Sequence, residues 1–319
     1  AALAETLGLA RSLGLVNFFG WRHSEMTRIA LVALEQGIQT DFVIRLVRER
    51  GLRPPQLPLA PDTWPWRLRI CTLGRFALFR DGEPLTLGGK GQRKPISLLQ
   101  TLLAYGGRTV STEQLSEAVW PDADSDASRR AFDTTLHRLR RLLDVDGILT
   151  VENGRLSLAP HLAWVDAWAL DAIVDDAAGW LRETDVQPPA EPLTALLGRI
   201  ENLYRGAFLG DDSDEPWVLA HRERLQQRAL RLLRDCGLTL ERIGAWQEAT
   251  ACYSLAIEIE PLAEAFYQRL MTALHTQGCK AEALATYERC REAMISTLGV
   301  VPSPQTIALH RHILTSGSD

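Results

Sequence analysis

The side chains best suited to chemistry lie in one basic segment, residues 128–144. At 100° per residue, its apolar and charged positions separate onto opposite faces of an α-helix. The polar face consists of Arg130, Thr134, His137 and Arg141, and it is flanked by Arg129, Arg138 and Arg140. A helix fits the major groove of DNA, where arginine can bridge O6 and N7 of guanine. The segment therefore indicates recognition of double-stranded DNA, against the alternative of a solvated helix surface.

The expected contacts fall into three groups. Base edges in the major groove are expected to be read by Arg130, Thr134, His137 and Arg138. Phosphates are expected to be bound by Arg129 and Arg141, and by Arg93 and Lys94 at the start of an upstream helix, where free N–H groups favour anions. A minor-groove contact is expected from Arg155, which follows the tip of a predicted hairpin.

Short elements on both sides of the basic segment must position it. Residues 147–160 read as two strands joined by Asn153-Gly154, the favoured pair for a type I′ turn. Residues 94–106 and 112–120 have helical apolar spacing, and Ser111 with Gln114 three residues later forms a capping-box pattern. Residues 67–87 alternate apolar and polar side chains and turn at Asp81-Gly82. These elements predict a winged helix that is preceded by a sheet.

Composition supports this interpretation. Residues 67–160 carry fourteen Lys and Arg against eleven Asp and Glu, a net charge of +3 in a chain of net charge −5. The five cysteines are scattered, which argues against a disulfide framework and a zinc site, and we expect no cofactor. No apolar run reaches about 18 residues, so we expect no membrane partner and a cytoplasmic location. A length of 319 residues suggests about two domains.

Residues 67–160 resemble an OmpR-type winged helix, and RRAFDTTLHRLRRLL followed by a wing carries the resemblance. In that family the loop between the second and third helices is associated with contact to RNA polymerase. This loop corresponds here to residues 121–126, and its members with that implied role are Pro121, Asp122, Asp124 and Asp126. An ordinary polar loop is the alternative.

An internal repeat follows the wing. Shifting the chain by 34 residues aligns Glu248, Ala249, Ala251 and Tyr253 with Glu282, Ala283, Ala285 and Tyr287. The apolar spacing is helical, so the pattern resembles tetratricopeptide (TPR) repeats, with alanines that allow close packing. We expect these residues to form a core and not a cofactor site. Asp166 is expected to cap the first helix after the wing.

Two further segments carry a second resemblance, LYRGAFLGDDSDEPWVLAHRERL at residues 203–225 and TLGVVPSPQTIALHRHIL at residues 297–314. Together with the repeat, they resemble the bacterial transcriptional activator domain of SARP or AfsR-like regulators. That resemblance implies regulation and protein contacts by the helical domain, in some members a homodimer, and promoter sites that are often direct repeats.

The first fifty residues predict two or three short helices, and residues 54–66 form a proline-rich linker. This segment resembles the end of the helical-repeat region of large MalT-like, ATP-dependent regulators. The chain also begins without methionine, so we expect it to be the output part of a longer protein. The GGKG at residues 88–91 lacks the spacing and the Ser or Thr of a Walker A motif.

The expected fold is mainly α with a small β content. An OmpR-type winged helix-turn-helix, with an N-terminal sheet, three helices and a wing, precedes an all-α, TPR-like helical-repeat domain. The expected domains are a short helical segment at 1–53, a linker at 54–66, the winged helix at 67–160 and the activator domain at 161–319.

The predicted function is sequence-specific binding of promoter DNA by a transcription activator. Its recognition helix, residues 128–143, would enter the major groove. The alternative is a protein-interaction scaffold whose winged helix no longer binds DNA. No GxSxG, HExxH or nucleotide-binding glycine motif is present, so we do not expect an enzyme. His310 and His312 are two residues apart on a helix and diverge, which argues against a metal pair.

Overall fold

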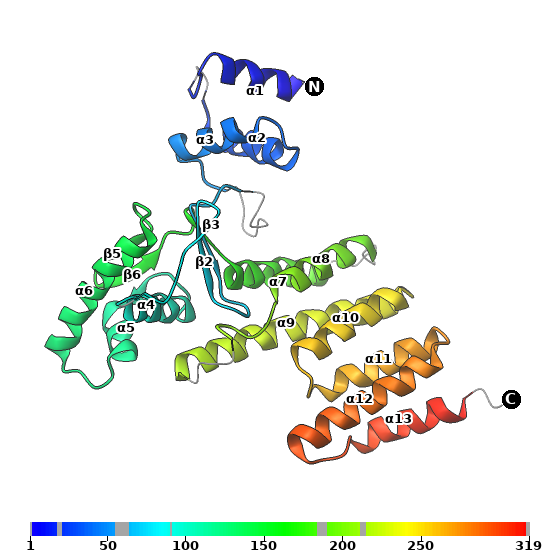
Figure 1. The fold of residues 1–319 in the computed structure, drawn as a ribbon. Helices are drawn as coiled ribbons and strands as arrows, with labels where there is room; N and C mark the ends of the chain where they lie inside the picture. The colour runs from blue at the N-terminus through cyan, green and yellow to red at the C-terminus, as the bar shows by residue number, and fades with distance from the viewer. Residues whose placement is uncertain are drawn as a thin grey trace. The chain divides into compact units, whose positions relative to one another are not determined.

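A computed structural model describes residues 2–17, 21–54, 64–89, 91–183, 190–210 and 215–316. The chain divides into two compact units. The first contains residues 1–169 and 209–221, and the second contains residues 170–208 and 222–319. Each unit is described by itself (Figure 1).

Three helices open the first unit. They are α1 (Ala2–Ser12), α2 (His23–Glu35) and α3 (Thr40–Arg50). Buried apolar side chains, among them Ala30, Ala33 and Val43, join α2 to α3, as the sequence predicts for this region. Helix α3 ends at Gly51, whose φ of 57° is left-handed and favours glycine. Of the predicted linker at 54–66, residues 55–63 lie outside the described residues, whereas Trp64 and Trp66 at its end are buried.

The predicted leading sheet is present and has a fourth strand. Its strands, in the order β3-β2-β1-β7, are β1 (Leu68–Cys71), β2 (Ala77–Arg80), β3 (Glu83–Pro84) and β7 (Ala163–Val165). Asp81 and Gly82 have φ of 50° and 93°, so a two-residue turn joins β2 to β3. Strand β7 pairs in parallel with β1, which places Ala163 beside Leu68. This strand follows residue 160, where the sequence predicts the winged helix to end, and the predicted domain limits stay a prediction.

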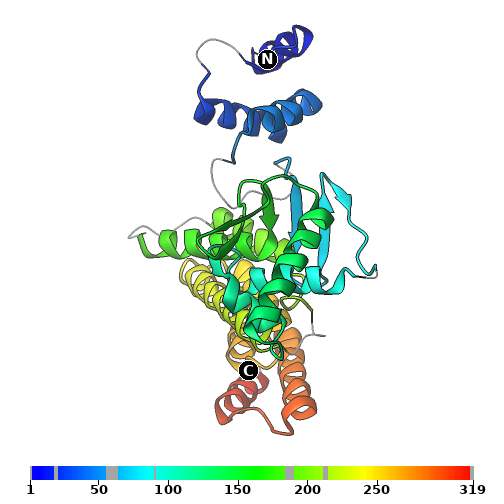
Figure 2. The same cartoon turned by 90° about the vertical axis from the view of Figure 1, so that its left-hand side faces the viewer.

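Three helices and a small sheet complete the winged helix. They are α4 (Arg93–Ala104), α5 (Thr112–Val119), α6 (Ser125–Leu143), β4 (Val110–Ser111), β5 (Leu149–Glu152) and β6 (Arg155–Leu158). Asn153 and Gly154 have φ of 51° and 70°, which confirms the predicted hairpin turn. Strand β4 adds a third strand beside β6 that the sequence does not predict. Figure 2 views this unit from the side on which α4, α5 and α6 lie in Figure 1.

Leucines form the core of the winged helix. Helix α4 packs against both α5 and α6. Its Leu98, Leu99 and Leu102 are fully buried, as are Leu139 of α6 and Leu156 of β6. Burial of one such side chain contributes roughly 1.5–3 kcal/mol, so these positions hold the three helices against the wing.

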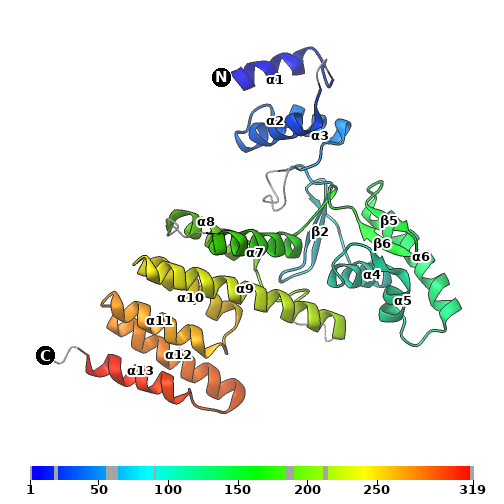
Figure 3. The same ribbon diagram turned by 180° about the vertical axis from the view of Figure 1, so that it is seen from behind.

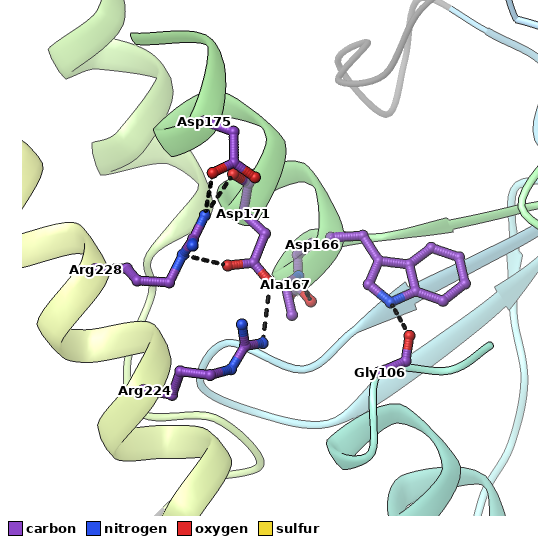
Figure 4. Close-up of polar contacts among 8 residues, drawn as sticks. Gly106, Asp166, Ala167, Asp171, Asp175, Arg224 and Arg228 are labelled. Carbon is purple, nitrogen blue, oxygen red and sulfur yellow. Dashed lines mark hydrogen bonds and ion pairs between the residues drawn. The ribbon is translucent and has the colours of Figure 1, made fainter. Parts of the chain in front are cut away.

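A buried carboxylate joins the leading sheet to the chain that follows the wing. Asp166 begins α7 (Asp166–Glu183) and is 4% exposed. Its Oδ2 accepts hydrogen bonds from the backbone N–H of Thr72 at 2.6 Å and of Leu73 at 2.8 Å. Its Oδ1 accepts from the Thr72 hydroxyl and from the Ala167 N–H, the latter at 2.8 Å (Figure 4). Asp166 is therefore the first residue of α7, where the sequence predicts a capping residue, and its side chain accepts one N–H of the first turn. It also holds the chain just after β1.

Burial raises the pKa of the Asp166 carboxyl, and the hydrogen bonds from Leu73, Thr72 and Ala167 oppose the rise. The pKa of Asp166 in the folded protein therefore lies above its ordinary value of 3.8.

Helices α7 and α9 begin in the first unit and continue into the second, which is all helical. The remaining helices are α8 (Ala190–Leu203), α9 (Pro216–Arg242), α10 (Trp246–Ile259), α11 (Glu264–Thr276), α12 (Lys280–Leu298) and α13 (Pro304–Thr315). Figure 3 shows α10 to α13 as successive layers, and each helix packs on the next.

Half of the repeated residues lie in this core, which corrects the expectation that all of them would: Ala251, Glu282 and Ala285 are exposed, and Glu248 is half-buried. Ala249 and Tyr253 of α10 and Ala283 of α12 are fully buried, and Tyr287 is 9% exposed. The Tyr253 hydroxyl donates to Glu241 Oε1 at 2.7 Å, which satisfies a polar atom that burial would otherwise leave unpaired. The repeat is therefore structural.

A glycine sets the distance between α9 and α10. A Cβ added to Gly237 would lie 2.4 Å from Cε1 of Tyr253, which no side-chain Cβ tolerates. Tyr253 is held by its core neighbours and by Glu241, so the ring cannot move away cheaply.

Gly237→Ala is expected to lower the free energy of unfolding by about 1–3 kcal/mol, because it overpacks this contact. Gly198→Ala in α8 is the matched control, since its Cβ would meet nothing within 4 Å. The control should be neutral or stabilising by about 0.5–1 kcal/mol. Urea unfolding of both variants checks the prediction, and equal midpoints would contradict it.

Asp166→Ala is expected to lower the free energy of unfolding by about 2–4 kcal/mol, because it leaves buried backbone N–H groups of Thr72 and Leu73 unpaired. Asp176→Ala is the matched control on the exposed side of the same helix and should change stability by less than about 0.5 kcal/mol. Asp166→Asn should recover part of the loss, because its amide oxygen can accept both bonds. No recovery in a urea titration would contradict this account.

The pH dependence of stability should also differ between wild type and Asp166→Asn. The folded-state pKa of Asp166 is raised, so its contribution is fully present below the unfolded value of 3.8 and is lost as pH rises through the folded pKa. The stability of the wild type relative to Asp166→Asn should therefore fall as pH rises through that window. Urea midpoints at a series of pH values measure it, and a relative stability that rises would contradict the assigned shift.

Candidate nucleic-acid interface

The predicted recognition helix is α6, and it begins three residues earlier than the predicted range of 128–143. Asp124 is its N-cap, with Oδ1 accepting the N–H of Ala127 at 2.7 Å. The helix ends at Leu143, and Asp144 follows in a left-handed conformation with φ of 49°. The carboxylate of Asp126 in the first turn complements the positive end of the helix dipole.

This start corrects the predicted polymerase-contact loop. Residues 121–126 do not all form a loop, because Asp126 lies in the first turn of α6. The capping bond of Asp124 ends the loop, whereas the predicted helix began at residue 128. Pro121, Asp122 and Asp124 remain outside the helices and are exposed.

Helix α6 has a buried apolar face and an exposed basic face. Phe132, Leu136 and Leu139 are at most 5% exposed. All six predicted contact residues on this helix are exposed, namely Arg129, Arg130, Thr134, His137, Arg138 and Arg141. Because α4 and α5 pack on the apolar side, the basic face is left toward solvent.

Five of these six residues form one stripe. Positions 130, 134, 137, 138 and 141 recur at i, i+4, i+7, i+8 and i+11, which places them on one side of a helix. At 1.5 Å per residue the stripe is about 16 Å long, a length that can follow several base pairs. The Thr134 hydroxyl donates to the Arg130 carbonyl at 2.9 Å, so its oxygen stays available to accept a hydrogen bond. Asp133 is an exposed acid next to the stripe.

The residues that begin α4 differ from each other. Arg93 is exposed in the first turn of α4. Lys90 in the preceding loop lies outside the described residues. Lys94 is engaged within the domain, because its Nζ donates to the Val119 carbonyl at 2.7 Å and lies 5.5 Å from the Trp120 ring centroid. The structure thus places Lys94 in contact with α5 and not as a free cation.

The wing is attached to the helices by main-chain hydrogen bonds. The Gly154 carbonyl accepts from the Thr112 N–H at 2.9 Å and from the Thr112 hydroxyl at 3.0 Å. Arg155 is exposed, but its Nη1 donates to the Thr109 carbonyl at 2.8 Å across the base of the wing. The guanidinium of Arg155 therefore already has a partner in the free protein.

Two arginines outside the predicted set fix the orientation of α6. Arg140 Nη2 donates to the Leu149 carbonyl at 3.1 Å, which joins α6 to β5. Arg80 of β2 pairs with Asp144 at 3.0 Å, which joins the end of α6 to the leading sheet. The sequence could not separate Arg140 from its neighbours, because only the fold shows which arginine of the run meets the wing.

The described residues contain no group of three or more His, Cys, Asp or Glu side chains that could hold a metal ion. Among them, no helix is both long enough and apolar enough to cross a membrane. His310 does not meet His312 but stacks on Tyr287, with ring centroids 3.9 Å apart, whereas His312 packs edge-on against His275.

Comparison with known proteins matches both parts of the chain. The family model "Bacterial transcriptional activator domain" matches residues 165–314, and the model "Transcriptional regulatory protein, C terminal" matches residues 89–154. The second match contains the whole of α4, α5 and α6.

Several relatives are named regulators. Regulatory protein AfsR of Streptomyces coelicolor is 31% identical over 77% of this chain. The chain spans only 24% of that relative, about a quarter of its length. Transcriptional regulatory protein EmbR of Mycobacterium tuberculosis is 25% identical, over 78% of this chain and 63% of the relative.

A solved structure shares the fold. Mycobacterium tuberculosis EmbR, in a complex with a low-affinity phosphopeptide, superposes with a TM-score of 0.54 at 22% identity. The superposition covers 78% of this chain and 65% of that chain. The chain thus combines an OmpR-type regulatory domain with a bacterial transcriptional activator domain, and it has homologues among the SARP or AfsR-like transcriptional regulators.

Proposed function

We propose that the chain binds promoter DNA sequence-specifically and activates transcription. The observation that carries the proposal is the exposed stripe of α6, which holds Arg130, Thr134, His137, Arg138 and Arg141 beside a wing. The apolar face of the same helix is committed to the core, so the stripe is the side that can enter a groove. Arginine in a major groove reads guanine, and a stripe of arginines also neutralises phosphates.

The proposed contacts are weighted by what each side chain already does. Arg130, Thr134, His137 and Arg138 read base edges, while Arg129, Arg141 and Arg93 bind phosphate. Lys94 and Arg155 are weaker proposals, because each must leave a protein carbonyl to reach DNA. An exchange of that kind gains little net free energy, since a hydrogen bond is lost for each one made.

RNA polymerase and a second copy of the chain are the proposed protein partners. The support is the SARP-type domain combination and the exposed acidic loop with Asp122 and Asp124. The proposed role is regulatory and not catalytic, and the location expected from the sequence stays a prediction. Direct repeats are the expected form of the DNA site, because two copies side by side would each present one α6.

Arg138→Ala combined with Arg141→Ala is expected to weaken binding to a selected site by at least about tenfold, with the fold intact. The site comes from a promoter-derived DNA library, with the bound fraction sequenced at several salt concentrations. The matched control is Arg289→Ala with Arg291→Ala, which removes the same charge from two exposed positions of α12. Loss of one phosphate contact should reduce the salt slope by about 1.

The outcomes separate the two functional hypotheses. Enrichment of a motif, with binding lost in the α6 variant and kept in the control, supports the activator. Binding without any enriched motif, or equal weakening in both variants, contradicts sequence-specific recognition by α6. It would favour the scaffold, in which the winged helix contacts proteins.

A further inference from the structure

A groove in the second unit is large enough for a small molecule. It lies between α7 and α9 and encloses about 710 Å³, within the range of 300–1,000 Å³ that small-molecule sites occupy. All of its lining residues belong to the second unit. The groove is separate from the winged helix, so its use does not depend on the DNA contacts proposed above.

The floor of the groove is apolar. Helix α7 contributes Val174, Ala178 and Leu181, and α9 contributes Leu232 and Leu238. Val174 and Leu232 are buried, whereas the other three are half-buried. A ligand that covered these side chains would gain roughly 25 cal/mol for each Å² of apolar surface removed from water.

The acids of the groove all have cationic partners. Asp175 accepts from Arg228 Nη2 at 2.8 Å, and Arg228 also pairs with Asp171 (Figure 4). Glu241 pairs with Arg269 at 3.2 Å, and Asp235 pairs with Arg234 at 3.0 Å. Each of these carboxylates is therefore already paired with an arginine of the protein.

Two arginines of the groove lack an acidic partner. Within the part of the chain that the structure describes, Arg231 and Arg242 form no ion pair. Arg231 bonds only to the Gln227 carbonyl, at 3.4 Å, and Arg242 bonds to Thr239 and Leu238, all within their own helix. Both are exposed at the edge of the groove, about 16 Å apart along α9 with the leucines between them.

We propose that this groove binds an apolar carboxylic acid, such as a fatty or aromatic acid. Its hydrocarbon body lies on the leucines of the floor, and its carboxylate pairs with Arg231 or Arg242. A guanidinium offers two parallel N–H donors that match a carboxylate, which gives the site its preference for this anion. The activator domain thereby carries a site for a small effector.

The test uses the full chain and 8-anilinonaphthalene-1-sulfonate, a fluorescent anion with an apolar body. A saturable, one-to-one rise in fluorescence is expected. Arg231→Gln combined with Arg242→Gln should raise the Kd by at least about tenfold, the value of one charge-assisted hydrogen bond. Arg289→Gln with Arg291→Gln is the control of equal charge change outside the groove and should leave the Kd unchanged.

Two further measurements keep the proposal open to contradiction. Ala178→Phe fills the groove and should abolish binding while far-UV circular dichroism stays unchanged. Decanoate should displace the probe at a concentration at least about tenfold lower than decan-1-ol or decylamine, because only decanoate supplies the anion. Equal displacement by the three, or an unchanged Kd in both groove variants, would overturn the proposal.

A separate apolar patch serves as a further check. Val300 and Val301 are 47% and 65% exposed after α12, and they could bind the same probe without any groove. Val301→Asp should leave the saturable signal unchanged. Loss of the signal in that variant would place the probe on the patch and overturn the assignment to the groove.

Discussion

The buried carboxylate of Asp166 is the constraint on which the architecture depends. It holds the chain after β1 through Thr72 and Leu73, and it begins α7 at the same time. These bonds join the leading sheet to the helix after the wing, although more than ninety residues separate Thr72 from Asp166. Three backbone N–H groups point at this buried acid, and their hydrogen bonds offset part of the cost of its desolvation. The leading sheet of the winged helix is thus held by a residue that lies outside its own three helices.

Sequence reasoning succeeded where the signal is local. The amphipathic period of α6, the Asn153-Gly154 turn and the Asp81-Gly82 turn each depend on neighbouring residues, and all three are present. It failed for β4 and β7, strands of two and three residues whose only signal is a distant partner strand. Charged side chains follow the same division. The exposure of Arg138 follows from helical periodicity, whereas the carbonyl that engages Lys94 belongs to another helix. Tertiary partners decide which cations are free, and a single sequence does not display them.

Helix α9 of the second unit has one side that packs closely on its neighbour and another side that borders a groove. One side of α9 meets α10 so closely that Gly237 cannot gain a methyl group, which fixes that contact within tenths of an ångström. Another side, with Leu232 and Arg242, borders an open groove that α7 lines across from it. The side of α9 that packs on α10 is rigid, and the side that borders the groove leaves room for another molecule. A repeat domain can change its surface in this way without losing its stacking, because each helix contacts only its neighbours.

The attachments of the wing have a consequence for the kind of duplex that suits this protein. Arg140 ties α6 to β5, and Thr112 holds Gly154 at the wing tip, so the two elements keep a set spacing before any ligand arrives. Their conformational entropy is lost during folding and not during association, which favours tight binding to a duplex whose adjacent grooves already match that spacing. In the proposed complex with DNA, a reader with this fixed spacing would discriminate through the bending stiffness of its target, even at base pairs that no side chain touches.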